Sequence, residues 1–155
     1  MSEDLEMQKR KLRARKTLEE VSKMRGMGTE LVTVIIPPEK MLHDVRHHLI
    51  QEGGQAANIK SKGTRKHVTD AIESAVSTLG RYKTPGERGI ALFVGHVITG
   101  NNKTRLISVV VDDPPEAFPS FRYRCDSSFE ASQLEAMLID KTAYGLFVID
   151  RSESA

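Results

Sequence analysis

A short polar sequence places an amide, an ammonium group and a hydroxyl within four positions, around one apolar side chain: Asn58, Ile59, Lys60 and Ser61. Lys60 can donate a hydrogen bond to uracil O4 or to a purine N7, and Asn58 and Ser61 can both donate and accept. Glu52, a carboxylate shortly before this sequence, complements Lys60 because it can accept from an imino N–H or an exocyclic amine. Such a set suits the reading of unpaired bases. A plain connector between two helices is the competing interpretation.

Basic residues accompany this sequence. Lys62, Arg65 and Lys66 follow Lys60, and six of the eight residues at 9–16 are Lys or Arg. Clusters of this kind neutralise phosphates, which makes nucleic acid a partner to consider, although a solvated helix face explains the run at 9–16 equally well. Aromatic residues make up 5% of the chain and Trp is absent, so no extended base-stacking platform is expected.

A second candidate group consists of Tyr123, Cys125 and Phe129. Alternation along a short strand places Tyr123 and Cys125 on one face, and Phe129 is expected to return to that side after a turn. Core packing of Cys125 and Phe129, with Tyr123 half exposed, is the simplest interpretation of these residues alone. Gly28 and Thr29 similarly indicate a flexible turn before a strand.

Other chemistries have weaker support. Three histidines share one predicted helix: His43, His47 and His48. They lack an evident third ligand and the H-E-x-x-H spacing, so solvated helix histidines are favoured over a zinc site. His67 and His96 are expected to be structural. Cys125 has no adjacent His, and neither G-x-S-x-G nor a phosphate-binding glycine loop occurs, so we expect no enzyme activity, no cofactor and no metal.

The hydrophobic pattern predicts the elements that hold these residues. The segment 3–24 lacks Gly and Pro and favours a helix, and the β-branched run at 31–38 favours a buried strand. Apolar residues three and four apart predict helices at 39–52 and 64–82. Gly53 and Gly54 are expected to end the first of these, so that a loop of about a dozen residues joins an αα-hairpin. The polar sequence then lies at the tip of a rigid stalk.

The second half of the chain predicts further strands and one more helix. Strands are expected at 90–98, 105–111, 121–125 and 144–151, with a helix at 129–140. The fold class is therefore α/β (α+β), with a mixed, largely antiparallel four- to five-stranded sheet packed by helices and a protruding αα-hairpin. We expect an N-terminal basic helix at 1–25 and a single domain at 26–155.

Composition narrows the class of protein. The chain has 155 residues, 39% hydrophobic and 28% charged, as in a soluble globular domain, and its net charge is +2. No apolar run approaches the ~18 residues of a membrane span, so no membrane partner is expected. One cysteine, Cys125, excludes an internal disulfide and fits a reducing cytoplasm. We expect a cytoplasmic monomer.

Taken together, three sequences resemble the N-terminal domain of archaeal and eukaryotic class-1 peptide chain release factors, with the archaeal type favoured. That family carries a G-T loop before the first strand, N-I-K-S at a helix-hairpin tip, and a Y-x-C-x-x-x-F element. All three occur here in the same order, at Gly28, at 58–61 and at Tyr123. The segments "GTELVTVIIPP" and "YGLFVIDR" also look typical of the family, so the resemblance covers nearly the whole chain from about residue 20.

The resemblance implies stop-codon recognition in the decoding site of the small ribosomal subunit. It assigns the first uridine to Lys60, Glu52 and Tyr123, and it places Gly28 and Thr29 near the purines. Cys125 and Phe129 are expected to shape the pocket, Asn58, Ile59 and Ser61 to complete the tip, and Lys62, Arg65 and Lys66 to contact the RNA backbone. The implied partners are the mRNA stop codon and small-subunit rRNA, and for the full-length family protein a translational GTPase and a recycling ATPase.

Some residues depart from the family pattern. Ala57 stands where many members have Ser or Thr, Glu30 where eukaryotic members have Ser, and Glu130 where His is frequent. These departures bear on third-base discrimination. The alternative function is a paralogous RNA-binding or ribosome-associated module that does not read codons.

The family's hydrolysis-triggering Gly-Gly-Gln lies in a middle domain that, with a C-terminal domain, is absent from these 155 residues. Here the triplet at 53–55 has no Arg-rich flank, so the sequence predicts a helix end and not a hydrolase.

Overall fold

Strand β1, Leu31–Ile36, lies inside the sheet and is buried at all six positions. The computed structural model describes residues 2–139, and its sheet has the order β3-β2-β1-β4. β2 spans Ile90–Gly100, β3 spans Lys103–Val111 and β4 spans Arg122–Asp126. Each neighbouring pair of these strands is antiparallel. The strand expected at 144–151 lies outside the described residues, and the α+β prediction is confirmed for the rest.

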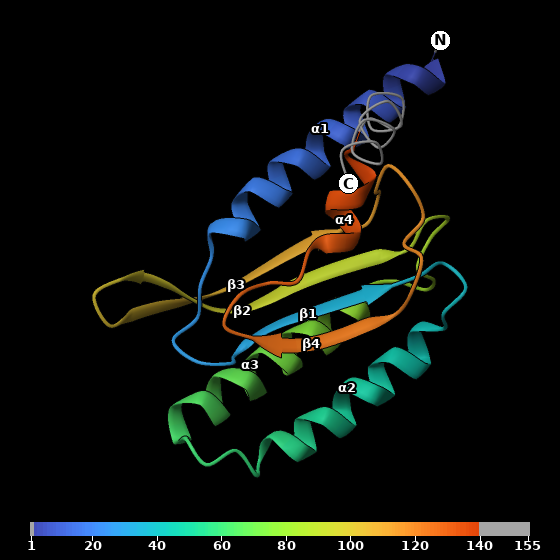
Figure 1. Cartoon of the computed structure of the whole chain (residues 1–155). Helices are drawn as coiled ribbons and strands as arrows, with labels where there is room; N and C mark the ends of the chain where they lie inside the picture. The colour runs from blue at the N-terminus through green and yellow to red at the C-terminus, as the bar shows by residue number, and fades with distance from the viewer. Residues whose placement is uncertain (1, 140–155) are drawn as a thin grey trace, which may run out of the picture.

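Helices cover both faces of the sheet, as predicted (Figure 1). Val32, Val34 and Ile36 pack on one face against α2, Leu42–Ala56, and α3, Lys62–Leu79. Ile35 packs on the other face, in a cluster with residues of α1, Ser2–Lys23, and α4, Ser132–Met137. Successive side chains of β1 therefore pack into two separate hydrophobic cores, one on each face of the sheet.

The α2–α3 pair forms the predicted αα-hairpin, but Gly53 and Gly54 do not end the first helix. α2 continues through both glycines to Ala56, and only residues 57–61 connect it to α3. A Cβ on Gly53 would lie 3.4 Å from Ile72 Cγ2, so this turn of α2 packs directly on α3. Packing against the neighbouring helix outweighs the cost of about 1 kcal/mol that each glycine adds to a helix interior. The tip loop is therefore much shorter than the sequence predicts.

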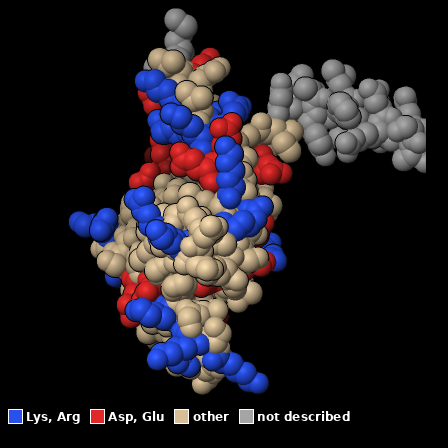
Figure 2. Space-filling model, turned by 90° about the vertical axis from the view of Figure 1, so that its left-hand side faces the viewer, with Lys and Arg blue, Asp and Glu red and all other residues tan. Residues whose placement is uncertain are grey.

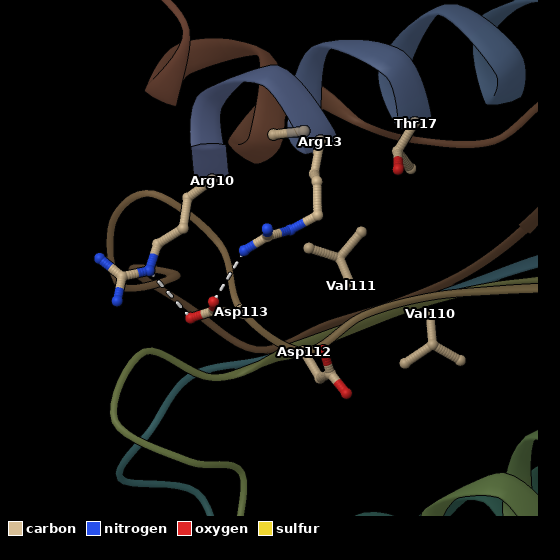
Figure 3. A pocket seen from close by; sticks show the side chains of 8 residues that line it. Arg10, Arg13, Thr17, Val110, Val111, Asp112 and Asp113 are labelled. Atoms are coloured by element: carbon tan, nitrogen blue, oxygen red, sulfur yellow. Dashed lines mark hydrogen bonds and ion pairs between the residues drawn. The ribbon is translucent and has the colours of Figure 1, made fainter. Parts of the chain in front are cut away.

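Helix α1 is fixed to the sheet by a buried stripe and by one carboxylate. Ala14 and Val21 are buried in the core that α1 shares with α4. Asp113, just after β3, binds Arg10 Nε at 3.1 Å, Arg13 Nη2 at 2.9 Å and Arg88 Nη2 at 2.5 Å. Figure 3 shows Arg10 and Arg13 reaching this carboxylate from α1. Between residues 2 and 139, no helix is long and apolar enough to cross a membrane.

The substitution Asp113→Asn tests this attachment. Burial alone would raise the pKa of the Asp113 carboxyl, but the hydrogen bonds and charges of Arg88 and Arg10 outweigh it and lower the pKa below 3.8. The ion pairs therefore stabilise the fold above about pH 4, and their contribution is lost as the pH falls through the lowered pKa. Since Asp113 is partly exposed, we expect Asp113→Asn to reduce the free energy of unfolding by about 1 kcal/mol at pH 7.

Urea unfolding of both chains at pH 7 and at pH 2 measures this difference. The gap between the native chain and Asp113→Asn should be present at pH 7 and absent at pH 2. Equal stability at pH 7 would show that the ion pairs of Arg10 and Arg13 with Asp113 do not hold α1 to the sheet.

Candidate nucleic-acid interface

The hairpin tip displays its polar side chains and anchors its apolar one. Asn58, Lys60 and Ser61 are exposed, whereas Ile59 is partly buried and packs against the core beneath α2 and α3. Arg65 Nη1 donates to the Ile59 carbonyl oxygen at 3.3 Å, which ties the loop to the first turns of α3. The tip is therefore a fixed platform, and Ile59 is its packing anchor.

Ser61 also begins the helix that follows it. Its backbone is extended, and its Oγ accepts a hydrogen bond from Thr64 N at 3.3 Å, the arrangement of an N-cap. The Ser61 hydroxyl can still donate its own proton. Lys60 makes no hydrogen bond or ion pair with any residue between 2 and 139, so its ammonium group is available to a ligand.

The basic side chains near the tip differ in their exposure and in the contacts that they make within the fold. Figure 2 shows Lys and Arg side chains gathered at the lower end of the molecule, over the hairpin tip. Lys60 and Lys62 are exposed, and the exposed Lys66 lies 3.7 Å from Asp70 Oδ2. Arg65 is partly buried, and its guanidinium group donates to the tip loop. This hydrogen bond competes with the expected contact between Arg65 and the RNA backbone.

Tyr123 and Cys125 share one face of β4, as alternation predicts. The Tyr123 hydroxyl lies 3.1 Å from Cys125 Sγ, and both side chains pack against the α2–α3 core. The His48 ring of α2 meets the Tyr123 ring edge-on, with 5.5 Å between centroids. His48 Nε2 also lies 3.9 Å from Glu52 Oε1. One face of α2 thus connects the strand β4 to the carboxylate near the hairpin tip.

Burial and the Glu52 charge keep the β4 pair uncharged. Burial raises the pKa of the Tyr123 phenol far above its ordinary value, and the Cys125 hydrogen bond and the Cys125 and Glu52 charges raise it further. Burial also raises the pKa of the Cys125 thiol; the Tyr123 hydrogen bond lowers it, and the Glu52 charge raises it again. Both groups are therefore protonated at neutral pH, and Glu52 is close enough to act on both.

Phe129 does not join Tyr123 and Cys125, and this expectation is wrong. It packs against the core on the opposite face of the sheet, with its ring centroid 5.6 Å from that of Phe93. The residue that follows Phe129 explains the crossing, because Glu130 N donates to Thr33 Oγ1 at 3.0 Å on that opposite face. Alternation holds only while the chain is a strand, and β4 ends at Asp126.

The loop of Gly28 and Thr29 lies against the other two segments. A Cβ on Gly28 would lie 3.0 Å from Thr64 Oγ1, so this glycine allows the loop to touch the start of α3. Gly26 N donates to the Ser127 carbonyl oxygen at 2.8 Å, which joins the same loop to the end of β4. The three sequence motifs are therefore neighbours in space.

Glu30 is the residue that sequence reasoning missed. It was notable only as a departure from a family pattern, yet it is buried and binds the loop that precedes it. The available signal was an acidic residue placed directly before a six-residue apolar strand, where an unpaired charge is costly. Among residues 2–139, no group of three or more His, Cys, Asp or Glu side chains has the geometry of a metal site.

The comparison with protein families now defines the class. The family model described as "eRF1 domain 1" matches residues 9–139, so the chain belongs to that family. The resemblance to the N-terminal domain of class-1 release factors is confirmed by this match.

Relatives and solved structures place it among the archaeal members. The chain is similar to the protein named "Peptide chain release factor subunit 1" from Picrophilus torridus, with 46% identity over 90% of this chain and 34% of that protein. The protein of the same name from Thermoplasma acidophilum is 44% identical over 94% of this chain and 34% of its own length. The chain thus spans about a third of these relatives.

Two solved structures share the fold. One is described as "Archaeal protein", with a TM-score of 0.79 and 32% identity over 84% of this chain and 36% of that one. The other is "Crystal structure of archaeal translation termination factor, aRF1", with a TM-score of 0.73 and 32% identity over 84% of this chain and 35% of that one. The archaeal type of the family is therefore confirmed.

The reactivity of Cys125 tests the geometry around β4. Because its thiol pKa is raised, alkylation by iodoacetamide at pH 7.5 should be at least about tenfold slower in the native chain than in the chain unfolded by urea. Glu52→Gln should accelerate alkylation of the native chain, since removal of the carboxylate charge lowers the thiol pKa. Mass spectrometry over time gives both rates.

The matched control is Glu73→Gln, which removes an exposed carboxylate from α3. This variant should leave the alkylation rate unchanged. An unchanged rate in Glu52→Gln as well would contradict the closeness of Glu52 to Cys125.

Proposed function

We propose that the chain is a stop-codon-recognition domain that acts in translation termination. The observation that carries this proposal is the exposed, unpaired Lys60 on a fixed tip, connected along α2 through Glu52 to Tyr123. The family match and the names of the archaeal relatives support it. The competing module that binds RNA without reading codons has no comparable support.

The side chains suit recognition of an unpaired uridine. Lys60 can donate to O4, Glu52 can accept from the imino N3–H, and the protonated Tyr123 hydroxyl can donate or accept. Lys60 lies in the tip loop, Glu52 on α2 and Tyr123 on β4, and the packing of these segments limits their movement, which is what base discrimination requires. We propose that Gly28 and Thr29 approach the purine positions and that Cys125 closes the pocket beside Tyr123.

The remaining assignments follow from the charges and from the family. Lys62 and Lys66 are exposed at the tip and suit contacts to phosphates of mRNA or small-subunit rRNA. We propose a basic helix at 1–25 followed by one codon-recognition domain at 26–155, in a cytoplasmic protein. Contacts with a translational GTPase and a recycling ATPase are proposed for the parts of the family protein that lie outside this chain.

We propose that the domain itself is not an enzyme. Gly53, Gly54 and Gln55 lie in the last turns of α2, not in a flexible loop. The backbone amides of residues 57–59 close this helix end by donating to the carbonyl oxygens of residues 54–56. The helical geometry gives the triplet a structural role, and termination chemistry belongs to another domain of the family protein.

Two substitutions at the tip test codon reading. The whole chain is joined to the remaining domains of the Thermoplasma acidophilum relative, and peptide release is measured on ribosomes that carry a stop codon. Lys60→Ala and Glu52→Gln should each reduce stop-codon-dependent release by about tenfold or more, because each removes a charge-assisted hydrogen bond of about 1.5–3 kcal/mol. Gln55→Ala is the matched control near the tip and should retain nearly full release. Unchanged release in Lys60→Ala and Glu52→Gln would contradict the proposal that the chain reads stop codons.

The isolated chain should bind single-stranded RNA weakly and with a strong dependence on salt. We expect a dissociation constant well above the micromolar range, because most of the binding comes from phosphate contacts. Replacement of Lys60, Lys62 and Lys66 by Gln should reduce the slope of log K against log salt by about 2, as expected for three contacts to a single strand. Fluorescence anisotropy with a labelled oligonucleotide measures both quantities. Micromolar binding of a free stop trinucleotide would contradict this expectation.

A further inference from the structure

A cleft at the base of the hairpin is lined by basic side chains other than those of the tip. It lies where the segment after β1 enters α2 and where the chain leaves α3, and its volume of about 550 Å³ is within the range of ligand sites. α2 has 15 residues, so its start in this cleft lies roughly 22 Å from its end at the tip (Figure 1). The charged and ring-bearing residues of the lining are Glu39, Lys40, His43, Arg46, Tyr82 and Lys83.

Arg46 is the central residue of this cleft because its guanidinium group has no partner. Its Nε is buried and makes no hydrogen bond with any residue between 2 and 139. No carboxylate in the same part of the chain forms an ion pair with it. A buried N–H without an acceptor is destabilising and rare in native structures. A ligand that accepts from Arg46 Nε would remove this cost.

The other lining residues add positive charge to the cleft. Lys40 Nζ lies 5.1 Å from the centroid of the Phe121 ring, a cation–π contact that holds the ammonium group but does not neutralise its charge. Lys83 is exposed and forms no ion pair within residues 2–139. Three lining residues are Lys or Arg and one, Glu39, is acidic, so the net charge of the lining is +2 with His43 neutral.

The start of α2 also lines the cleft. Met41 is the N-cap, and its side chain makes no hydrogen bond to the helix. The backbone N–H groups of the first turn therefore have no side-chain cap, and the helix dipole adds partial positive charge at this end. Asp44 in this turn is exposed and is not among the lining residues. The Asp112 carboxylate accepts a hydrogen bond from the Tyr82 hydroxyl at 2.8 Å, and neither contacts Arg46.

We propose that this cleft binds a backbone phosphate of RNA and is a second nucleic-acid site, separate from the tip. The edge of the Arg46 guanidinium group that carries Nε–H and one Nη–H donates to two oxygens of the phosphate, which satisfies the buried N–H. Lys40 and Lys83 supply further positive charge, and the first amides of α2 complete the site, as helix N-termini do for other anions.

The two ends of the hairpin favour RNA over a free phosphate or an acidic protein segment. Lys60 and Lys62 are exposed at the tip and Lys83 is exposed at the base, and none of them forms an ion pair within residues 2–139. A nucleic acid carries regularly repeated phosphates and can reach both ends, whereas a free phosphate occupies one. The choice of RNA also rests on the proposed function, which places the domain against RNA. The cleft would then add affinity and orientation without reading sequence.

The Nε–H signal of Arg46 in NMR spectra reports on the cleft directly. In the 155-residue chain it is identified as the signal that Arg46→Lys lacks. It is followed during titration with inorganic phosphate, with an oligouridylate and with an oligoglutamate peptide of the same net charge as the oligouridylate. The oligouridylate should shift the signal and slow its exchange with solvent, at a concentration at least about tenfold lower than inorganic phosphate, because the RNA also binds the tip.

The peptide should shift the Arg46 signal less than the oligouridylate at equal concentration. No shift with the oligouridylate would overturn the inference. Equal binding of inorganic phosphate, or an equal shift with the peptide, would overturn the assignment of the cleft to RNA.

The concentration dependence of peptide release separates the cleft from the tip. In the same fusion protein, Arg46→Gln should raise the concentration for half-maximal release by about tenfold at UAA, UAG and UGA alike, because it removes a bidentate phosphate contact. Release at saturating concentration should not change, since the contact is made equally before and during the reaction. Lys83→Gln changes an exposed side chain and should act in the same direction with a smaller effect. Arg105→Gln, an exposed arginine of β3 outside the cleft, is the matched control and should leave the concentration nearly unchanged.

The outcomes distinguish the inference from the proposed function. Unchanged half-maximal concentrations in Arg46→Gln and Lys83→Gln would overturn the inference and leave codon reading intact. An effect that differs among the three codons would also overturn it, because a backbone phosphate carries no base identity. If the unaltered fusion protein shows no release that depends on a stop codon, the proposed function fails, and the titration of the Arg46 signal still decides whether the cleft binds RNA.

Discussion

The burial of β1 on both of its faces is the constraint on which the rest of the structure depends. All six of its residues are buried, so the fold requires a helical layer on each side of the sheet and a paired strand along each edge. The Gly28–Thr29 loop leads into this strand, the α2–α3 hairpin follows it, and β4 pairs with its edge. Segments that are about a hundred residues apart therefore meet because each is attached to the same strand.

The site is built where local preference and tertiary packing disagree. Gly53 and Gly54 weaken a helix, yet α2 passes through them because its contact with Ile72 and its neighbours stabilises the helical form. Burial of the Glu30 carboxylate is costly, yet the backbone amides of Met27 and Gly28 and the imidazole of His67 hold it inside the fold. In both places the surrounding packing decides the conformation, and in both the result fixes a segment that displays polar groups to solvent.

The sequence predicts the hairpin and the described strands along the chain, because apolar residues recur there with the periods of helices and strands over many positions. The family is indicated by three short motifs, at Gly28, at 58–61 and at Tyr123. The sequence does not predict that Phe129 crosses to the opposite core, since alternation carries no information past the end of β4 at Asp126. It also does not predict the contact between Glu30 and His67, which lie 37 positions apart. Pairings between distant polar residues depend on the final packing and leave no periodic pattern in the chain.

The hairpin packs along its length, so its tip belongs to the same rigid body as the sheet. The 18 residues of α3 extend roughly 27 Å at 1.5 Å per residue, and buried residues recur along this helix from Val68 to Leu79. Ala56 and Ile59 extend the same core to the tip. A core residue that never meets a ligand therefore helps to set where Lys60 stands, and a change in its volume is felt at the surface of the tip.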